Sequence, residues 1–483
     1  MSRTIICLNC QAELYPKQRS LTCPQCSSND VVFTYSVDDK NNPVIQQNEK
    51  GIWRFKDFLP LFKRTISLGE SNTPIHKARF LFKSDVELHL KIEGKNPTGS
   101  FLDRVSPLMI SDALSREMHS VVCASDGNLG ASLSAYCAAA QLQCYCVVPK
   151  STSPEKRTQM LAFGAEIIDY GKTIDESLNL ATKMIEKGRY QATPEFNILT
   201  LEGTKTIALE IAEQFYSNNS TNLLDYVIVP MGSGNLLYSI WLGFKQAKKF
   251  GLIPTNKALP KIIGVQLKGF DPITKAFESG NSKQLLSGSS KKRNSVAGAI
   301  LVQKPIFGEK AIQSLKESNG LAVSVTDKEL IHASKQLGKY EGVYAELSSA
   351  TVIAAVSKLL EEKQIPKDST ILSIITASGF KSSQAFEKGT YRVKRVESFR
   401  SLGTKAEILQ VINSGESNFG YGIWKALGET ISLQAVYQHL KELQNQLMLI
   451  TEVESSDRQK RYQLTTKGKQ IIVKMQELEE LLS

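Results

Sequence analysis

The chain has 483 residues, of which 41% are hydrophobic and 22% charged, and its 59 Lys+Arg exceed its 48 Asp+Glu to leave a formal net charge of +11. This composition excludes a disordered or fibrous chain, and the length suggests about three domains. No segment approaches the roughly 18 uninterrupted apolar residues of a membrane helix, and the first residues lack the apolar core of a signal peptide. We therefore expect a mildly basic, cytoplasmic protein that has no membrane partner.

Four of the eight cysteines open the chain in a metal-binding pattern. Cys7 and Cys10 form one C-x2-C pair, and Cys23 and Cys26 form a second. A two-residue gap lets two thiolates converge on one tetrahedral ion, and two such pairs supply the closed shell of a structural zinc. Two disulfides are the alternative, which the absence of a secretory signal disfavours. We predict a zinc ribbon over residues 1–45 that stabilises the fold and performs no chemistry.

Residues 46–390 alternate between short apolar runs and longer amphipathic segments, the pattern of a parallel sheet covered by helices. Buried strands are predicted at 121–124, 144–149, 226–230, 262–267 and 371–376, and helices at 129–141, 154–163, 175–187 and 237–250. Glycine-containing turns follow three of the strands, at 125–128, 231–235 and 376–379. Ligands bind beyond the carboxyl ends of parallel strands, where glycines let backbone N–H groups approach an anion. Several such turns therefore favour a phosphate-bearing ligand.

Two segments in this region carry a family resemblance. Ser67-Leu-Gly-Glu-Ser-Asn-Thr-Pro-Ile75 and Lys91-Ile-Glu-Gly-Lys-Asn-Pro-Thr-Gly-Ser-Phe-Leu-Asp-Arg104 resemble signatures of threonine synthase, a pyridoxal-phosphate (PLP) enzyme of the tryptophan-synthase-β (type II) fold. Further motifs follow in the family's order at 122–132, 229–237, 341–349 and 375–379. Some threonine synthases also carry an N-terminal zinc ribbon. The resemblance implies a two-lobed α/β domain over residues 46–390, with a smaller lobe inserted at about 100–215.

The resemblance also implies which residues contact ligands. Asn128 would lie beside the phenolic oxygen of PLP, and Thr376 would face its pyridine nitrogen. The cofactor's phosphate would be bound by Gly232, Ser233, Gly234 and Asn235. The carboxylate or phosphate of a substrate would be bound by amide, hydroxyl and guanidinium groups, those of Asn96, Thr98, Ser100 and Arg104.

One position departs from the family pattern. The family has Ser-Phe-Lys-Asp-Arg, whose lysine forms the Schiff base with the cofactor, whereas Leu102 stands there in this chain, and Val105 replaces the glycine that usually follows the arginine. The lysine amine holds the cofactor's aldehyde and moves protons on the substrate, and leucine can do neither. We therefore predict no catalytic residue and, at most, non-covalent binding of PLP. Two alternatives stay open: Leu102 is a variant in a working enzyme, or the pocket is a retained scaffold.

A different kind of sequence follows a charged linker at 391–403. Residues 404–483 are predicted to form three helices, a two-stranded wing at 449–453 and 461–465, and a last helix at about 466–482. The third helix begins at the N-cap Ser432 and carries an apolar stripe expected to be buried, namely Val436, Leu440, Leu443 and Leu447. This order resembles the winged helix-turn-helix of PadR-type and MarR-type repressors.

The resemblance implies contact with double-stranded DNA through exposed residues of the third helix and the wing. These residues are Gln434, Tyr437, Gln438, Lys441, Arg458, Lys460 and Arg461. The domain is close to neutral overall, so a basic footprint must be local. The alternative is a winged helix used for protein contacts or dimerisation.

Together these features predict a DNA-binding transcriptional regulator. Its threonine-synthase-like domain would bind PLP, an amino-acid adduct of PLP, or a phosphohomoserine-type ligand without turnover, and closure of the pocket would change the affinity for DNA. One alternative is threonine synthase itself, which converts O-phosphohomoserine and water to threonine and phosphate. Another is an inactive partner of a true threonine synthase. A homodimer suits both halves of the chain.

Overall fold

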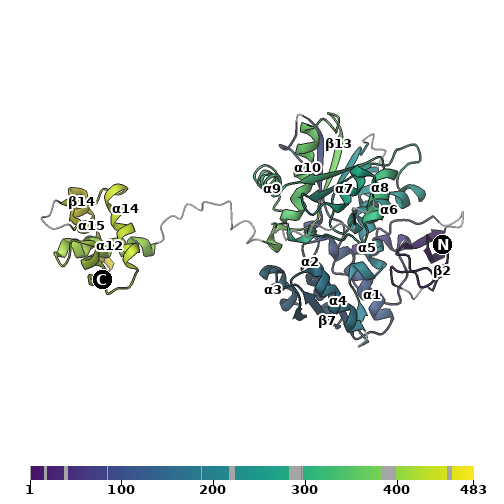
Figure 1. The fold of residues 1–483 in the computed structure, drawn as a ribbon, viewed down its shortest axis with the longest axis horizontal. Coiled ribbons are helices and arrows are strands. Elements are labelled where there is room, and N and C mark those ends of the chain that lie inside the picture. Colours follow the sequence, from purple (N-terminus) through teal and green to yellow (C-terminus); the bar gives the residue numbers. More distant parts are fainter. Residues whose placement is uncertain are drawn as a thin grey trace. The chain divides into compact units, whose positions relative to one another are not determined.

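The structure is a computed structural model, and it describes residues 2–15, 19–36, 42–83, 85–185, 188–216, 223–281, 285, 295, 297–382, 399–453 and 459–482 (Figure 1). The chain divides into two compact units, residues 1–389 and 390–483, and each is described by itself. None of the helices within the described ranges is long and apolar enough to span a membrane.

A six-stranded sheet forms the larger lobe of the first unit, with strand order β12-β11-β10-β13-β5-β4. All neighbouring strands are parallel except β4 with β5. The strands are β4 (Ile75–Lys77), β5 (Glu87–Ile92), β10 (Tyr226–Pro230), β11 (Lys261–Leu267), β12 (Leu321–Val325) and β13 (Thr370–Ile375). The central strands are buried along nearly their whole length, which explains why their sequences are apolar throughout instead of alternating.

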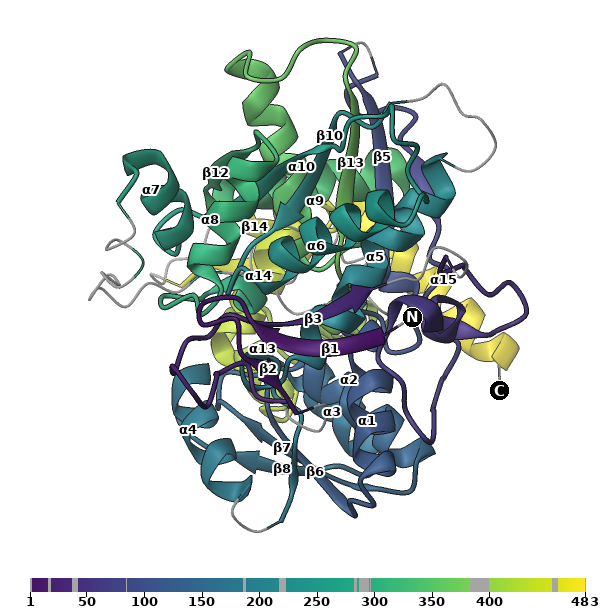
Figure 2. The ribbon, with the colours of Figure 1, turned by 90° about the vertical axis from the view of Figure 1, so that its right-hand side faces the viewer.

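Helices cover this sheet, as Figure 2 shows. They are α5 (Leu199–Tyr216), α6 (Asn235–Lys249), α7 (Pro272–Ser279), α8 (Gly308–Glu317), α9 (Asp327–Glu341) and α10 (Leu347–Glu361). The first part of α10 is buried on all sides, from Leu347 to Val356, so its sequence shows no amphipathic stripe. A capping box at Thr326 and Glu329 begins α9.

A four-stranded parallel sheet of order β8-β7-β6-β9 forms the smaller lobe. Its strands are β6 (Ser120–Ala124), β7 (Gln143–Val148), β8 (Glu166–Asp169) and β9 (Tyr190–Gln191), and its helices are α1 (Ser106–Ser115), α2 (Asn128–Ala139), α3 (Pro154–Ala162) and α4 (Ile174–Ile185). These elements end before α5, which packs against α6 of the larger lobe. The smaller lobe is therefore shorter than the span of 100–215 expected from the sequence.

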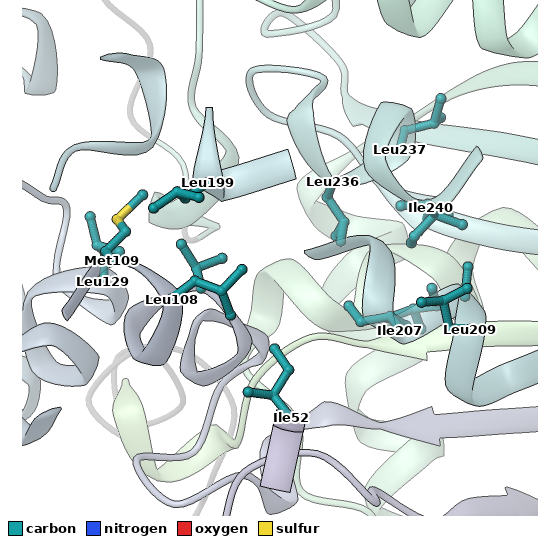
Figure 3. Close-up of a cluster of buried hydrophobic side chains, with 14 of the residues drawn as sticks. Ile52, Leu108, Met109, Leu129, Leu199, Ile207, Leu209, Leu236, Leu237 and Ile240 are labelled. Carbon is teal, nitrogen blue, oxygen red and sulfur yellow. The ribbon is translucent and has the colours of Figure 1, made fainter. Parts of the chain in front are cut away.

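The two lobes share one apolar core. Leu108 and Met109 of α1 belong to the same buried cluster as Ile207 of α5 and Ile240 of α6 (Figure 3). Because protein interiors are close-packed, such a shared core couples the positions of the two sheets.

The N-terminal segment is a small three-stranded antiparallel sheet of order β2-β1-β3. Its strands are β1 (Ser2–Cys7), β2 (Glu13–Leu14) and β3 (Val31–Ser36). Its apolar side chains pack against later residues of the same unit, namely Ile198, Leu201, Tyr238 and Phe307. The short 3-10 helix η1 (Gly51–Phe58) follows it.

The second unit has its own core. Helices α12 (Phe399–Ser414), α13 (Gly420–Ala426) and α14 (Leu433–Asn445) precede the antiparallel pair β14 (Ile450–Val453) and β15 (Arg461–Leu464), and α15 (Thr466–Leu482) ends the unit. The order of elements is the predicted one, although α12 begins before residue 404. Val436, Leu440 and Leu443 are buried as expected. The prediction for Leu447 is wrong: it lies beyond the end of α14 and is 37% exposed.

Candidate functional site

The turns that follow β5, β10 and β13 leave the same edge of the six-stranded sheet. The register pairs Ile375 with Ile92 and places the ends of β10 and β13 side by side. The backbone N–H of Phe101 donates to the Thr376 carbonyl (2.9 Å), which ties the short 3-10 helix η3 (Phe101–Arg104) to the end of β13. Leu102 lies on η3, half-buried against the core that the lobes share. The sheet edge thus brings together the segments from which the sequence predicts a ligand site.

Asn128 is the first residue of α2 and lies where the lobes meet. Its Nδ2 donates to Glu346 Oε2 (2.7 Å), and Glu346 Oε1 accepts from Lys156 Nζ (2.7 Å). Gly127 has φ +132°, and a Cβ there would lie 2.2 Å from Lys156 Cδ, so only glycine lets the lysine stem cross this turn. Among the residues described, Asn128 Oδ1 is buried without a hydrogen-bond partner. The side chain that bridges the two lobes therefore carries an unpaired acceptor.

The glycine turn after β10 has the form of an anion site. Gly234, with φ +90°, precedes α6, and a Cβ on it would lie 2.8 Å from the Phe307 carbonyl oxygen. No side chain caps the first turn of α6, so its backbone N–H groups and the positive end of the helix dipole are available. Gly232 and Ser233 are half-buried. The Asn235 side chain is engaged within the protein, because its amide donates to Thr200 Oγ1 (2.9 Å) and its carbonyl accepts from Ser239, and its role at a phosphate stays a prediction.

Thr376, 7% exposed, lies directly after β13. Its hydroxyl shares a hydrogen bond with the Ser349 hydroxyl (2.7 Å), and Ser349 Oγ also accepts from the Ala377 N–H (3.0 Å). The start of α10 thus holds the Thr376 hydroxyl in place.

Arg104 belongs to a buried charge network. Its guanidinium donates to Glu93 (2.7 and 2.8 Å) and to Glu210 (3.0 Å), and Lys91 donates to Glu210 (2.6 Å); all four side chains are fully buried. Burial raises the pKa of Glu210, but the charges of Arg104 and Lys91 outweigh it and hold that pKa well below its ordinary value. The guanidinium in this structure therefore stabilises the protein's own carboxylates.

The other predicted anion contacts are also largely engaged within the protein. Asn96 donates to Glu93 and accepts from the Ser71 N–H, and both the hydroxyl and the N–H of Thr98 donate to Asp103. Ser100 is the exception, because its buried hydroxyl has no partner among the described residues. An anion role for these four residues stays a prediction, and Ser100 is the one with a free group.

Three ionisable groups near this site were missed by the sequence reasoning: Lys156, Glu346 and Lys381. Lys381 Nζ donates to the Thr98 carbonyl (2.7 Å) and to Gln159 Oε1 (2.8 Å), and burial lowers its pKa to about 8. For Lys156, burial is outweighed by the charges of Glu346 and Asp126, and its pKa is raised. The sequence could have pointed to both lysines. Lys156 and Lys381 lie shortly after the carboxyl ends of β7 and β13, where ligands bind in parallel sheets.

The four N-terminal cysteines converge on one point. Their sulfur atoms all lie within 4.8 Å of one another, with Cys7 and Cys26 3.6 Å apart and Cys10 and Cys23 3.7 Å apart. A tetrahedral zinc with Zn–S bonds of about 2.3 Å needs sulfur atoms about 3.8 Å apart. The Asn9 side-chain amide donates a hydrogen bond to Cys26 Sγ (3.5 Å), a contact that favours the thiolate form of this cysteine. The cysteine cluster therefore fits a structural metal ion.

The residues predicted to contact DNA lie partly on α14 and partly on β15 and the turn before it. Gln434, Tyr437, Gln438 and Lys441 are exposed along α14, as expected from their spacing. Lys460 pairs with Glu452 (3.0 Å) across the two-stranded sheet, and Arg461 is half-buried at the start of β15. Arg458 lies outside the described residues.

Comparisons with known proteins identify relatives of the first unit. A family model described as "Pyridoxal-phosphate dependent enzyme" matches residues 66–377. The threonine synthase of Methanocaldococcus jannaschii is 32% identical over 398 residues, which cover 81% of this chain and 96% of that protein. The threonine synthase of Methanosarcina acetivorans is 31% identical over 382 residues, covering 78% and 92%.

Solved structures agree on the fold. Maize serine racemase superposes with a TM-score of 0.54 at 21% identity and covers 66% of this chain and 91% of its own. A fungal L-serine ammonia-lyase from Rhizomucor miehei gives a TM-score of 0.57 at 19% identity, covering 67% and 98%. A mutant of O-ureido-L-serine synthase with lysine changed to alanine, bound to O-ureido-L-serine, gives 0.55 at 18%, covering 71% and 99%. At these identities the likeness is one of fold.

Proposed function

This chain belongs to the pyridoxal-phosphate dependent enzymes, and on that premise we propose that its first unit is a receptor for PLP or a PLP–amino acid adduct, without turnover, joined to a DNA-binding second unit. One observation carries the proposal: the position at which the resemblance implies the cofactor-bonding lysine is Leu102, a half-buried hydrocarbon packed on the core. The protein would act in the cytoplasm as a homodimeric regulator, with genes of amino-acid or vitamin B6 metabolism as targets.

The residues present fit the cofactor. Asn128 Oδ1 and Ser100 Oγ are buried polar atoms that lack a partner among the described residues, as expected of groups that pair with a ligand. The turn at Gly232, Ser233 and Gly234 is too tight for a Cβ at Gly234 and offers the free N–H groups of a helix start to a phosphate. When bound, PLP supplies an electron sink for chemistry at an amino acid, chemistry that requires an amine at residue 102.

Without an amine at residue 102, the first unit could bind PLP and still be unable to catalyse a reaction. Without that amine, ligand exchange and proton transfer both fail; proton transfer alone is commonly worth about 10²- to 10⁴-fold in rate. Binding relies on other groups, because the phosphate turn and Asn128 do not involve Leu102. The ligand-bound lysine-to-alanine mutant of O-ureido-L-serine synthase supports this view, since that protein retains an amino-acid ligand although a lysine is missing.

A signal from the pocket requires two conformations with unequal ligand affinity. The contacts that join the lobes are suited to this: Glu346 of the larger lobe accepts from Asn128 and Lys156 of the smaller one. A ligand that takes over the Asn128 amide would compete with Glu346 and so change how the lobes are held. The more strongly the ligand prefers one arrangement of the lobes over the other, the more its binding would change the affinity for DNA.

DNA binding is proposed from the second unit alone. Three helices and a two-stranded antiparallel sheet, with α14 exposing Gln434, Tyr437, Gln438 and Lys441, support a winged helix whose α14 enters the major groove. Lys460 and Arg461 would reach phosphates beside it. The family model ends at residue 377 and says nothing of this unit.

The test starts with calorimetric titration of zinc-replete, full-length protein with PLP and with its preformed serine and threonine Schiff bases. We expect saturable binding and no phosphate release from O-phosphohomoserine. We also expect the protein to retain random double-stranded DNA at low salt. The double variant Arg458→Ala plus Arg461→Ala should weaken this retention, and the bound ligand should change it. The proposal would be refuted if no ligand binds, or if the double variant retains DNA as well as the wild type does.

A second candidate, threonine synthase, is favoured by one observation. The chain is 32% identical to a curated threonine synthase over 96% of that protein's length. Lys381, with its pKa lowered to about 8, would then have to supply the missing amine. Phosphate release from O-phosphohomoserine, abolished by Lys381→Met, would select this candidate. Co-purification with an active threonine synthase, without DNA retention, would select the inactive-partner alternative.

A further inference from the structure

We propose that the metal-binding ribbon holds the phosphate-binding turn in place, so that metal occupancy controls the affinity of the pocket for PLP. The inference rests on the proposed function, because it assumes that the turn at 232–235 binds the ligand's phosphate. It adds a role for the ribbon, which would otherwise be a passive stabiliser at the N-terminus.

Two of the metal-binding cysteines also belong to the apolar cluster that reaches the turn. Cys7 and Cys23 are 0% and 1% exposed, and they pack in one cluster with Tyr238 and Phe307 of the larger lobe. A zinc ion would therefore fix the sulfur atoms of side chains that form part of this interface. Because closely packed side chains transmit small displacements, movement of the cysteines changes the packing of Tyr238 and Phe307.

Tyr238 and Phe307 contact the phosphate-binding turn directly. The Phe307 N–H donates to the Ser233 carbonyl (3.0 Å), and Tyr238 lies in the first turn of α6, where its N–H makes the first helical hydrogen bond to the Gly234 carbonyl (3.1 Å). The Phe307 carbonyl lies so close to Gly234 that a Cβ there would approach it to 2.8 Å. We infer that a shift of Phe307 would move the Ser233 and Gly234 backbone to which it is bonded, and with it the N–H groups that would meet a phosphate.

Lys310 strengthens the link between ribbon and turn. Its ammonium donates to the Asn29 carbonyl (2.6 Å) and pairs with Asp30 (3.1 Å), both in the ribbon. The same ammonium lies over the rings of Tyr238 (5.2 Å to the centroid) and Phe307 (5.8 Å). One side chain thus contacts the ribbon and both positioning residues.

Lys249 provides a matched control. It also donates to a ribbon carbonyl, that of Tyr35 (2.9 Å), but it is the last residue of α6. The helix begins at Asn235, so Lys249 lies about 21 Å from the turn along the helix. Lys249→Met removes a lysine contact with the ribbon without touching the residues that hold the turn.

The experiment measures PLP affinity of the full-length protein, by calorimetry, before and after zinc removal with a chelator. We expect zinc removal to weaken PLP binding about 5-fold or more, the lower bound of ordinary coupling between sites. Coupling is reciprocal, so saturating PLP should raise zinc affinity by the same factor, measured against a chromophoric chelator. Equal PLP affinity with and without zinc would overturn the inference and leave the proposed function standing. Absence of PLP binding in both states would overturn both.

If the zinc-free protein unfolds, two lysine variants test the same inference in the zinc-loaded protein. In the zinc-loaded state, Lys310→Met should weaken PLP binding about 5-fold, whereas Lys249→Met should leave it unchanged. Equal losses in both variants, or no loss in either, would overturn the inference. Circular dichroism of each variant establishes that it is folded.

Discussion

At the scale of single residues, the proposed loss of turnover depends on Leu102, which the resemblance aligns with the Schiff-base lysine. The backbone of its segment is tied to the end of β13, because the Phe101 N–H donates to the Thr376 carbonyl. The side chain itself offers no proton and no nucleophile. Of the buried amines that the structure describes, Lys381 donates to Thr98 and Gln159, Lys156 donates to Glu346, and Lys91 donates to Glu210, the partner of Arg104.

Leu102→Lys should restore covalent attachment of PLP. The new amine would lie on the segment that the resemblance assigns to the Schiff-base lysine, and it would condense with the aldehyde, with loss of water. Borohydride reduction followed by mass spectrometry should then find PLP on the peptide that contains residue 102. Leu102→Met, the control, and the wild type should carry no label. Labelling of Lys156 or Lys381 in the wild type would show that another amine has replaced the missing one.

Arg104 has a structural role that its motif conceals. It neutralises Glu93 and Glu210 in a region without solvent, and removal of one partner leaves buried charges uncompensated. We expect Arg104→Ala to lower the free energy of unfolding by about 3–5 kcal/mol at neutral pH. The control Lys77→Ala removes the exposed partner of Glu87 and should cost less than about 1 kcal/mol. Urea unfolding measures both, and a loss of Arg104 that costs no more than the control would contradict the assignment.

The same network predicts a pH dependence. In the wild type, burial is outweighed by positive partners, and the pKa values of Glu93 and Glu210 lie below their unfolded values. Their stabilisation is therefore present above about pH 4 and is lost as pH falls through the folded pKa values. In Arg104→Ala, burial is expected to raise the pKa of Glu93. Acidification then protonates this carboxylate, which removes an uncompensated buried charge and makes the variant more stable. The difference in unfolding free energy between wild type and variant should narrow from pH 7 to pH 4, and a constant difference would refute this account.

At the scale of elements, turns and helix starts determine where functional groups lie. Gly127 and Gly234 adopt positive φ immediately before α2 and α6, and in both places a Cβ would collide with a neighbour. In the second unit, the Ser432 hydroxyl accepts from the Ala435 N–H (3.2 Å) and begins α14, the helix proposed to read DNA. The local chemistry of these turns thus sets the position of a whole helix.

Ser432→Ala should destabilise the second unit by about 1 kcal/mol, because the Ala435 N–H loses its side-chain acceptor and keeps only the backbone carbonyl of residue 432 (2.9 Å). Ser432→Asp retains an acceptor and should change stability by only a few tenths of a kcal/mol. Urea unfolding of residues 399–483 compares the three proteins. If the aspartate variant loses as much stability as the alanine variant, the cap does not hold the helix.

At the scale of the whole molecule, the two units differ in what stabilises them. The lobes of the first unit share a core and are joined by polar contacts at Glu346 and Lys381, whereas the core cluster of the second unit, as far as its residues are described, lies within 408–472. A unit with a complete core of its own can fold without the rest of the chain.

The fragment 399–483 should therefore fold alone. We expect a helical circular dichroism spectrum and a cooperative thermal transition, because the described residues that form a buried cluster with Val436, Leu440 and Leu443 lie inside the fragment. Residues 1–389 should bind PLP with the affinity of the full chain when DNA is absent. A fragment without a cooperative transition would show that the second unit depends on the first.

The sequence by itself determined the features that depend on local spacing and periodicity. The cysteine pairs, the glycine turns after β6 and β10, and the exposed face of α14 were all predicted, because each follows from a few neighbouring residues. Strands β10 and β13 could also be located, since buried parallel strands are continuous apolar runs. Leu447 was misplaced because the helical period was extended past the residue at which α14 ends.

Only the tertiary structure decided how distant residues combine. The pairing of Asn128 with Glu346, the position of Lys381 beside Thr98 and the burial of Arg104 between Glu93 and Glu210 join segments tens to hundreds of residues apart. No local pattern encodes such contacts, because they depend on strand order and on the way the lobes close. The contact of the ribbon with Tyr238 and Phe307 has the same origin: the chain brings β1, β2 and the start of β3 against residues that follow them by 200 positions or more.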